Sequence, residues 1–89
     1  MAEVKSGNNE FYIEEGGEKV ATIEYVPQEN GVITVTHTNV NESHNGKGLG
    51  KELVNRIAEF ARTENKRIDA QCSYAKHVLG KGEHKDLLV

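Results

Sequence analysis

Cysteine is scarce in this sequence, because Cys72 is the only one among 89 residues. A single cysteine cannot form an intrachain disulfide, which favours a reducing compartment. It cannot build a cysteine zinc site either, and the four histidines have no carboxylate partner at ligand spacing. The sequence therefore predicts no metal site.

Long apolar runs are missing as well. No stretch approaches the roughly 18 to 20 apolar residues that a membrane-spanning helix needs. Residues 1–9 are polar and lack the apolar stretch of a secretory signal. We therefore expect a cytoplasmic protein without a membrane partner.

An excess of positive charge is also absent, since the formal net charge is -3. This balance disfavours nucleic acid as a partner. A phosphate-bearing ligand would need a local basic feature, and Lys47 and Lys51 provide one among several glycines. With 36% hydrophobic and 28% charged residues the composition is globular, and the length predicts one domain over residues 1–89.

Three segments rich in aromatic and β-branched residues predict an antiparallel meander, at residues 11–13, 20–25 and 32–40. In the third segment Ile33, Val35 and His37 alternate with threonines, so we expect these three side chains to share one face. The alternation predicts a sheet that is packed on one face and partly wet on the other.

The period then changes to that of a helix over residues 48–64, followed by a short strand at residues 68–72. A strand, a helix and a second strand predict a right-handed βαβ unit with parallel strands. A short helix is expected at residues 73–79, and an edge strand at residues 86–89. The predicted fold class is α+β.

A glycine-rich loop at residues 45–50 joins the third strand to the long helix. Glycines let backbone N–H groups approach an anion, and the helix N-terminus adds partial positive charge. A P-loop would need glycine at position 45 and serine or threonine at position 52, where the sequence has Asn45 and Glu52. A dinucleotide fingerprint would need glycine at position 51, which is Lys51.

The loop resembles the cofactor motif of GCN5-related N-acetyltransferases, in which Arg or Gln, two residues, Gly, one residue, and Gly or Ala open the long helix. Here the motif reads from Asn45 to Gly50, with Asn45 in place of Arg or Gln. The resemblance covers residues 20–79 and is greatest to the small members of fewer than about 100 residues. Residues 14–19 leave room only for a turn where larger members have helices that shape the acceptor site.

This resemblance implies binding of acetyl-CoA or CoA and transfer of an acyl group to an unknown amine acceptor. It implies that the thioester carbonyl is polarised by a backbone amide near Asn39 and Val40. The cofactor-binding residues that it implies are Asn39, Val40, Asn45, Gly46, Lys47, Gly48, Leu49, Gly50 and Lys51.

The acid that protonates the leaving thiolate is a tyrosine in many members. Aligning the sequence on Ala75 places Leu79 at that tyrosine and Cys72 at the asparagine seven residues earlier. Tyr74 or Cys72 could replace the acid, or solvent could protonate the thiolate.

Two residues keep alternative interpretations. Cys72 shares strand parity with Ile68 and Ala70, so it is either a small core residue or a thiol beside the acyl group, acting as nucleophile, acid or acyl carrier. His37 is either a hydrogen-bonded sheet histidine or the base that accepts the amine proton.

Two hypotheses of different classes follow. One is an N-acetyltransferase that uses acetyl-CoA, with Cys72, His37 and Tyr74 as candidate catalytic residues. The other is a non-catalytic module that binds CoA or acyl-CoA, which Leu79 and the absent acceptor helices favour. Neither the acceptor nor the oligomeric state follows from the sequence.

Overall fold

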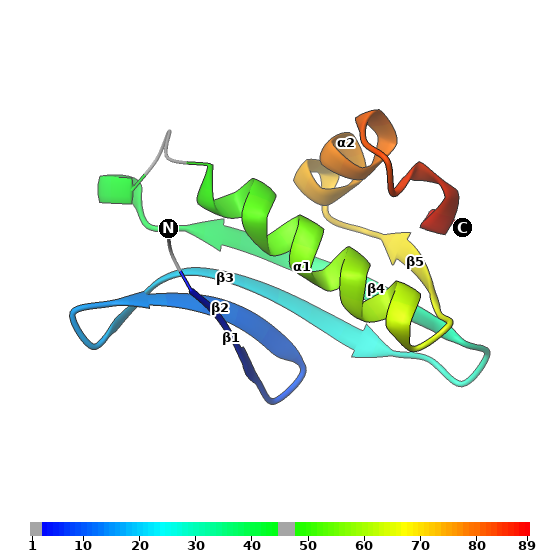
Figure 1. Ribbon diagram of the computed structural model, residues 1–89, viewed down its shortest axis with the longest axis horizontal. Coiled ribbons are helices and arrows are strands. Elements are labelled where there is room, and N and C mark those ends of the chain that lie inside the picture. The colour runs from blue at the N-terminus through cyan, green and yellow to red at the C-terminus, as the bar shows by residue number, and fades with distance from the viewer. Residues whose placement is uncertain (1–2, 45–47) are drawn as a thin grey trace.

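The computed structural model describes residues 3–44 and 48–89, which form a mixed sheet covered on one face by helices (Figure 1). The five strands follow one another in chain order across the sheet, and all neighbours are antiparallel except β4 and β5, which are parallel. The strands are β1 (Val4–Gly7), β2 (Glu10–Glu15), β3 (Glu18–Pro27), β4 (Val32–Val40) and β5 (Arg67–Ala70).

Two α-helices follow the meander, α1 (Leu49–Thr63) between β4 and β5, and α2 (Ser73–Lys81) after β5. The described residues also form two short 3-10 helices, η1 (Glu42–His44) and η2 (Lys85–Leu87). The α+β prediction, with a meander, a βαβ unit and a short C-terminal helix, is confirmed.

The prediction from sequence was wrong for three segments. It missed β1, because the segment VKSG is polar and has only one partly buried side chain, Val4. It extended the last strand to Cys72, whereas β5 ends at Ala70. It assigned a strand to residues 86–89, where η2 occupies the beginning and only Leu88 makes an isolated bridge to Ile68.

The core lies between the inner face of the sheet and the apolar stripe of α1, and α2 packs against the same layer. Its fully buried side chains include Ile13, Ile23, Ile33, Val35, Leu53, Val54, Ile57, Ile68 and Leu79. Full burial of such a side chain stabilises the fold by about 1.5 to 3 kcal/mol. This packing, rather than local propensity, holds α1 across the strands.

A bulge in β4 alters which side chains face the core. Glu24 pairs with His37 but Tyr25 pairs with Val35, so Thr36 is an extra residue in β4. An extra residue reverses the alternation beyond it. The prediction that His37 shares a face with Ile33 and Val35 is therefore wrong, because those two are buried while His37 is exposed.

The outer face of the sheet carries polar side chains. No helix formed by residues 3–44 and 48–89 covers this face. Gly16 and Gly17, both with positive φ, form the tight turn that joins β2 to β3. On the outer face the Lys19 ammonium lies 4.4 Å from the centroid of the Tyr12 ring. The expectations of a turn at residues 14–19 and of one wet face are confirmed.

Candidate functional site

The pairing between β4 and β5 stops halfway along β4. It runs from Val32 opposite Arg67 to Val35 opposite Ala70. The N–H groups of Gln71 and Cys72 then both donate to the Val35 carbonyl, at 3.0 and 3.2 Å. Beyond this point β4 continues for residues 36–40, while the chain after β5 turns into α2 (Figure 1).

Residues 36–40 of β4 thus have no partner strand on the β5 side within the described chain, and we call this stretch the open edge. The Asn41 N–H donates to the Val20 carbonyl at 2.7 Å, and alternate residues of an antiparallel strand bond to the same neighbour. Thr38 and Val40 therefore direct their backbone groups to the open edge. Asn39, which sequence reasoning grouped with Val40, directs its backbone groups to β3.

The open edge leads toward the N-terminus of α1. The first intrahelical bond there joins the Glu52 N–H to the Gly48 carbonyl at 3.1 Å, so the N–H groups of Leu49, Gly50 and Lys51 have no carbonyl within the helix. The N-cap residue is Gly48, which has no side chain that could cap this end of the helix. These N–H groups lie at the positive end of the helix dipole, an arrangement that can hold an anion, and we call this part of α1 its candidate anion-binding end.

The residues of the predicted glycine loop and of the helix start after it differ in their exposure. Gly48 adopts φ 76°, and a β-carbon there would have no atom within 4 Å, so this position borders open space. Leu49 is buried in the core, whereas Lys51 is exposed. Asn45, Gly46 and Lys47 lie outside the described residues.

Gly50 has a role that sequence reasoning did not find. A β-carbon at Gly50 would lie 2.9 Å from both Cε2 and the hydroxyl oxygen of Tyr74. The Tyr74 ring therefore packs directly on the Gly50 backbone, and its hydroxyl lies at the first turn of α1. The absence of a side chain at Gly50 makes room for this tyrosine, which is still 41% exposed.

Cys72 lies on the opposite side of the open edge from β3, immediately before α2. Its Sγ atom is 3.4 Å from the Thr38 Oγ1 atom, and the side chain is half-buried. Burial raises the pKa of the Cys72 thiol, but the hydrogen bond that joins the thiol to the Thr38 hydroxyl and backbone hydrogen bonds at Ala75, Tyr74 and Thr38 outweigh burial. The pKa is therefore below its ordinary value. Cys72 and Tyr74 thus both lie near the junction of β4, α1 and α2.

Leu79 and His37, the other two positions considered in the sequence analysis, do not lie at the open edge. Leu79 is 1% exposed and belongs to the core, so its side chain does not reach the open edge. His37 pairs with Glu24 across the strands and is exposed on the outer face. The structure therefore places Cys72 beside Thr38 and Tyr74 beside Gly50, and leaves His37 on the other side of the sheet.

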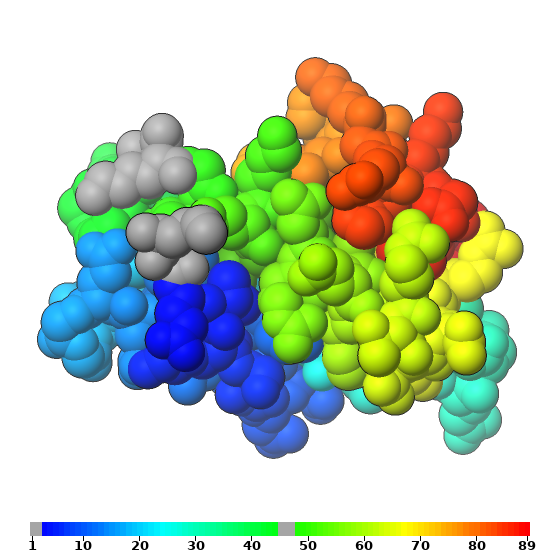
Figure 2. All heavy atoms as spheres, viewed as in Figure 1, coloured from blue at the N-terminus to red at the C-terminus, as the bar shows by residue number. Residues whose placement is uncertain are grey.

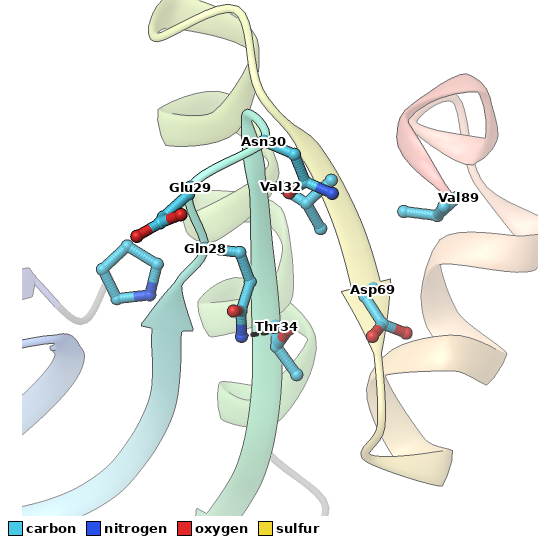
Figure 3. A pocket seen from close by; sticks show the side chains of 8 residues that line it. Gln28, Glu29, Asn30, Val32, Thr34, Asp69 and Val89 are labelled. Atoms are coloured by element: carbon cyan, nitrogen blue, oxygen red, sulfur yellow. Dashed lines mark hydrogen bonds between the residues drawn. The ribbon is translucent and has the colours of Figure 1, made fainter.

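A separate hollow of about 780 Å³ lies at the opposite end of β4 (Figure 3). It is lined by Pro27, Gln28, Glu29, Asn30, Val32, Thr34, Asp69 and Val89. Inside it the Gln28 amide donates to the Thr34 hydroxyl at 3.1 Å. This hollow adjoins the turn between β3 and β4, whereas the candidate anion-binding end follows the last residue of β4, so the two do not form one site.

Residues 3–44 and 48–89 contain neither a candidate membrane span nor a candidate metal cluster. No helix in these ranges is both long and apolar enough to cross a membrane. No group of three or more histidine, cysteine, aspartate or glutamate side chains in them is arranged to hold a metal ion.

Comparison with known proteins gives one family. The family model described as GCN5-related N-acetyl-transferase matches residues 10–87. The solution structure of a GCN5-like protein from Staphylococcus aureus is 38% identical, with a TM-score of 0.81 over 99% of this chain and 88% of that chain. No curated protein matches the chain.

A more distant likeness concerns the fold alone. An IAA acetyltransferase from Bacillus cereus is 18% identical, with a TM-score of 0.64 over 81% of this chain and 51% of that chain. The chain thus corresponds to about half of that larger protein.

Proposed function

Because this chain belongs to the GCN5-related N-acetyltransferase family, we propose that it binds acetyl-CoA and transfers the acetyl group to an amine. One observation carries the proposal. The open edge of β4 leads to a helix N-terminus whose first N–H groups have no acceptor within the helix. Together they offer backbone donors and acceptors to an amide chain and a candidate site to phosphates.

The residues present fit such a ligand. The N–H groups of Leu49, Gly50 and Lys51 would hold the pyrophosphate, together with the glycine loop that precedes them in the sequence. The backbone groups of Thr38 and Val40 would bind the amides of the pantetheine arm as an added strand would. Acetyl-CoA supplies an activated thioester to this site.

Two side chains near the open edge are suited to proton transfer. Tyr74 has a partly exposed hydroxyl at the first turn of α1, and Cys72 has a thiol of lowered pKa next to Thr38. Either can protonate the departing thiolate, and the Cys72 thiolate can also accept the acetyl group itself. A base role for His37 requires the amine to approach from the outer face.

The test is CoA release from acetyl-CoA in the presence of a panel of amines. We expect release that depends on one class of amine. If Cys72 donates a proton, Cys72→Ala should lower the transfer rate by about 100-fold with unchanged CoA affinity. If Cys72 accepts the acetyl group, acetyl-CoA without amine should add one acetyl mass to the wild type and none to Cys72→Ala.

Cys72→Ser serves as the matched variant, because it keeps a small polar side chain beside Thr38 but has no acidic thiol. It should transfer as slowly as Cys72→Ala if the thiol matters. Wild-type rates in both variants would return Cys72 to a packing role and leave Tyr74 as the candidate acid.

The second candidate function is a non-catalytic module that binds CoA, and burial of Leu79 favours it. The position that holds the acid in many family members is part of the core here and cannot donate a proton at the open edge. Tight CoA binding without release of CoA for any amine of the panel would support this alternative.

A further inference from the structure

The short helix η1 lies, along the chain, between the open edge and the start of α1. Val40 ends β4, η1 follows after one residue, and Gly48 is the N-cap of α1. The path of the chain after β4 therefore decides whether the open edge stays uncovered. It also sets the point from which the chain enters α1, so the contacts of η1 with the sheet bear on the proposed cofactor site.

Backbone hydrogen bonds hold the beginning of this path on the β3 side of β4. The Asn41 N–H donates to the Val20 carbonyl at 2.7 Å, so the residue after β4 still pairs with β3. The His44 N–H then donates to the Asn41 carbonyl at 2.8 Å and closes the turn of η1. The backbone thus begins to leave β4 on the side away from β5.

The imidazole of His44 uses both of its ring nitrogens at this end of the sheet. Nε2 lies 3.0 Å from Oε1 of Glu15, the last residue of β2, and Nδ1 lies 2.9 Å from Oγ of Ser43. A carboxylate only accepts hydrogen bonds, so Nε2 donates to Glu15, and in the neutral ring Nδ1 accepts the Ser43 hydroxyl. Figure 2 shows η1 in green against the light blue turn that follows β2, at the left of the view.

The bridge from His44 to Glu15 spans a strand. β3 lies between β4 and β2 in the sheet, so a contact from η1 to β2 has to cross the end of β3. A segment tied to β2 cannot lie at the same time on the β5 side of β4, where Thr38 and Val40 direct their backbone groups. The bridge therefore acts on the same part of the fold as the open edge, although it makes no contact with it.

We propose that His44 is a positioning residue for the cofactor site. Its bridge to Glu15 holds η1 at the β2 end of the sheet, which keeps the open edge uncovered and fixes the point from which the chain enters α1. A binding surface that is held in place before the ligand arrives loses less conformational entropy when it binds. The proposal rests on the proposed function, because the affinity for CoA is the quantity that reports it.

The test is a double-mutant cycle on the affinity for CoA, measured by calorimetry. Removal of either partner breaks the same bridge, so His44→Ala and Glu15→Ala should each weaken CoA binding by about fivefold. The double variant should also lose only about fivefold, because one bridge can be lost only once. Independent effects would multiply to about 25-fold. Neither side chain belongs to the core, so the variants should remain folded.

A conservative variant separates hydrogen bonding from a general loss of the side chain. His44→Gln keeps an N–H donor that can reach the Glu15 carboxylate, so its affinity for CoA should stay within about twofold of the wild type. A role that depended on the imidazole ring as such would not be restored by an amide. The recovery in His44→Gln therefore identifies the hydrogen bond to Glu15 as the cause.

Glu14→Ala is the matched control. Glu14 is the neighbouring carboxylate of β2, and it pairs with Lys5 at 2.8 Å rather than with η1. The variant removes the same charge from the same strand and breaks an ion pair, but it leaves the bridge of His44 intact. It should therefore bind CoA as the wild type does.

Four results would overturn this inference alone, since in each of them the wild type still binds CoA. They are wild-type affinity in folded His44→Ala, a loss of about 25-fold in the double variant, no recovery in His44→Gln, and a loss of about fivefold in Glu14→Ala. Failure of the wild type to bind CoA would overturn the proposed function, and this inference with it.

Discussion

Replacing Gly48 with valine is expected to reduce CoA affinity by at least about 100-fold. Gly48 has φ 76°, a conformation that strains a β-branched residue, and it precedes the N–H groups of α1 that have no acceptor within the helix. The new side chain would extend into space that is empty within 4 Å and that the pyrophosphate has to enter. Calorimetry with CoA on the folded variant measures the loss.

Gly31→Val is the control for this substitution. Gly31 has φ 77° and open space around it, but it lies in the turn before β4. The two variants should therefore lose similar stability, while only Gly48→Val loses CoA affinity. An equal loss of affinity in both would attribute the effect to stability, and wild-type affinity in folded Gly48→Val would refute the pyrophosphate assignment.

Leu79→Tyr is expected to destabilise the protein by about 3 kcal/mol without increasing acetyl transfer. Leu79 is 1% exposed among core side chains, so a tyrosine there adds volume to a packed region and buries a hydroxyl that has no partner. The substitution restores the residue that many family members have at this position, but not its access to the open edge. Urea denaturation and the CoA-release assay measure the two quantities.

Leu79→Met provides the comparison, because it nearly preserves volume and should cost less than about 1.5 kcal/mol. A stable Leu79→Tyr variant that transfers acetyl groups faster than the wild type would contradict the view that position 79 belongs to the core. It would also show that the chain retains an acceptor site that needs only an acid.

The main elements were predictable because their patterns are local. Alternation in residues 32–40 and helical spacing in residues 48–64 each identify one element without reference to the rest of the chain. The spacing of glycines from Gly46 to Gly50, placed between a strand and a helix, led by the same kind of local reasoning to a phosphate site at the start of α1, which stays a prediction.

The features that shape the candidate site depend on tertiary contacts and were not predictable. The bulge at Thr36 becomes visible only when the register with β3 is known, and it reverses the faces of His37 and Thr38. The contact of Tyr74 with Gly50 joins residues 24 positions apart in different helices. β1 depends on pairing with β2, because its own composition is polar.

The measurement that tests the central claim most directly is an NMR titration of the ¹⁵N-labelled protein with CoA. Binding at the open edge and at the start of α1 should shift the amide signals of Thr38, Val40 and residues 48–51 far more than those of residues 14–25. Shifts of equal size in both regions, or no shifts at saturating CoA, would contradict the cofactor assignment on which the proposed function depends.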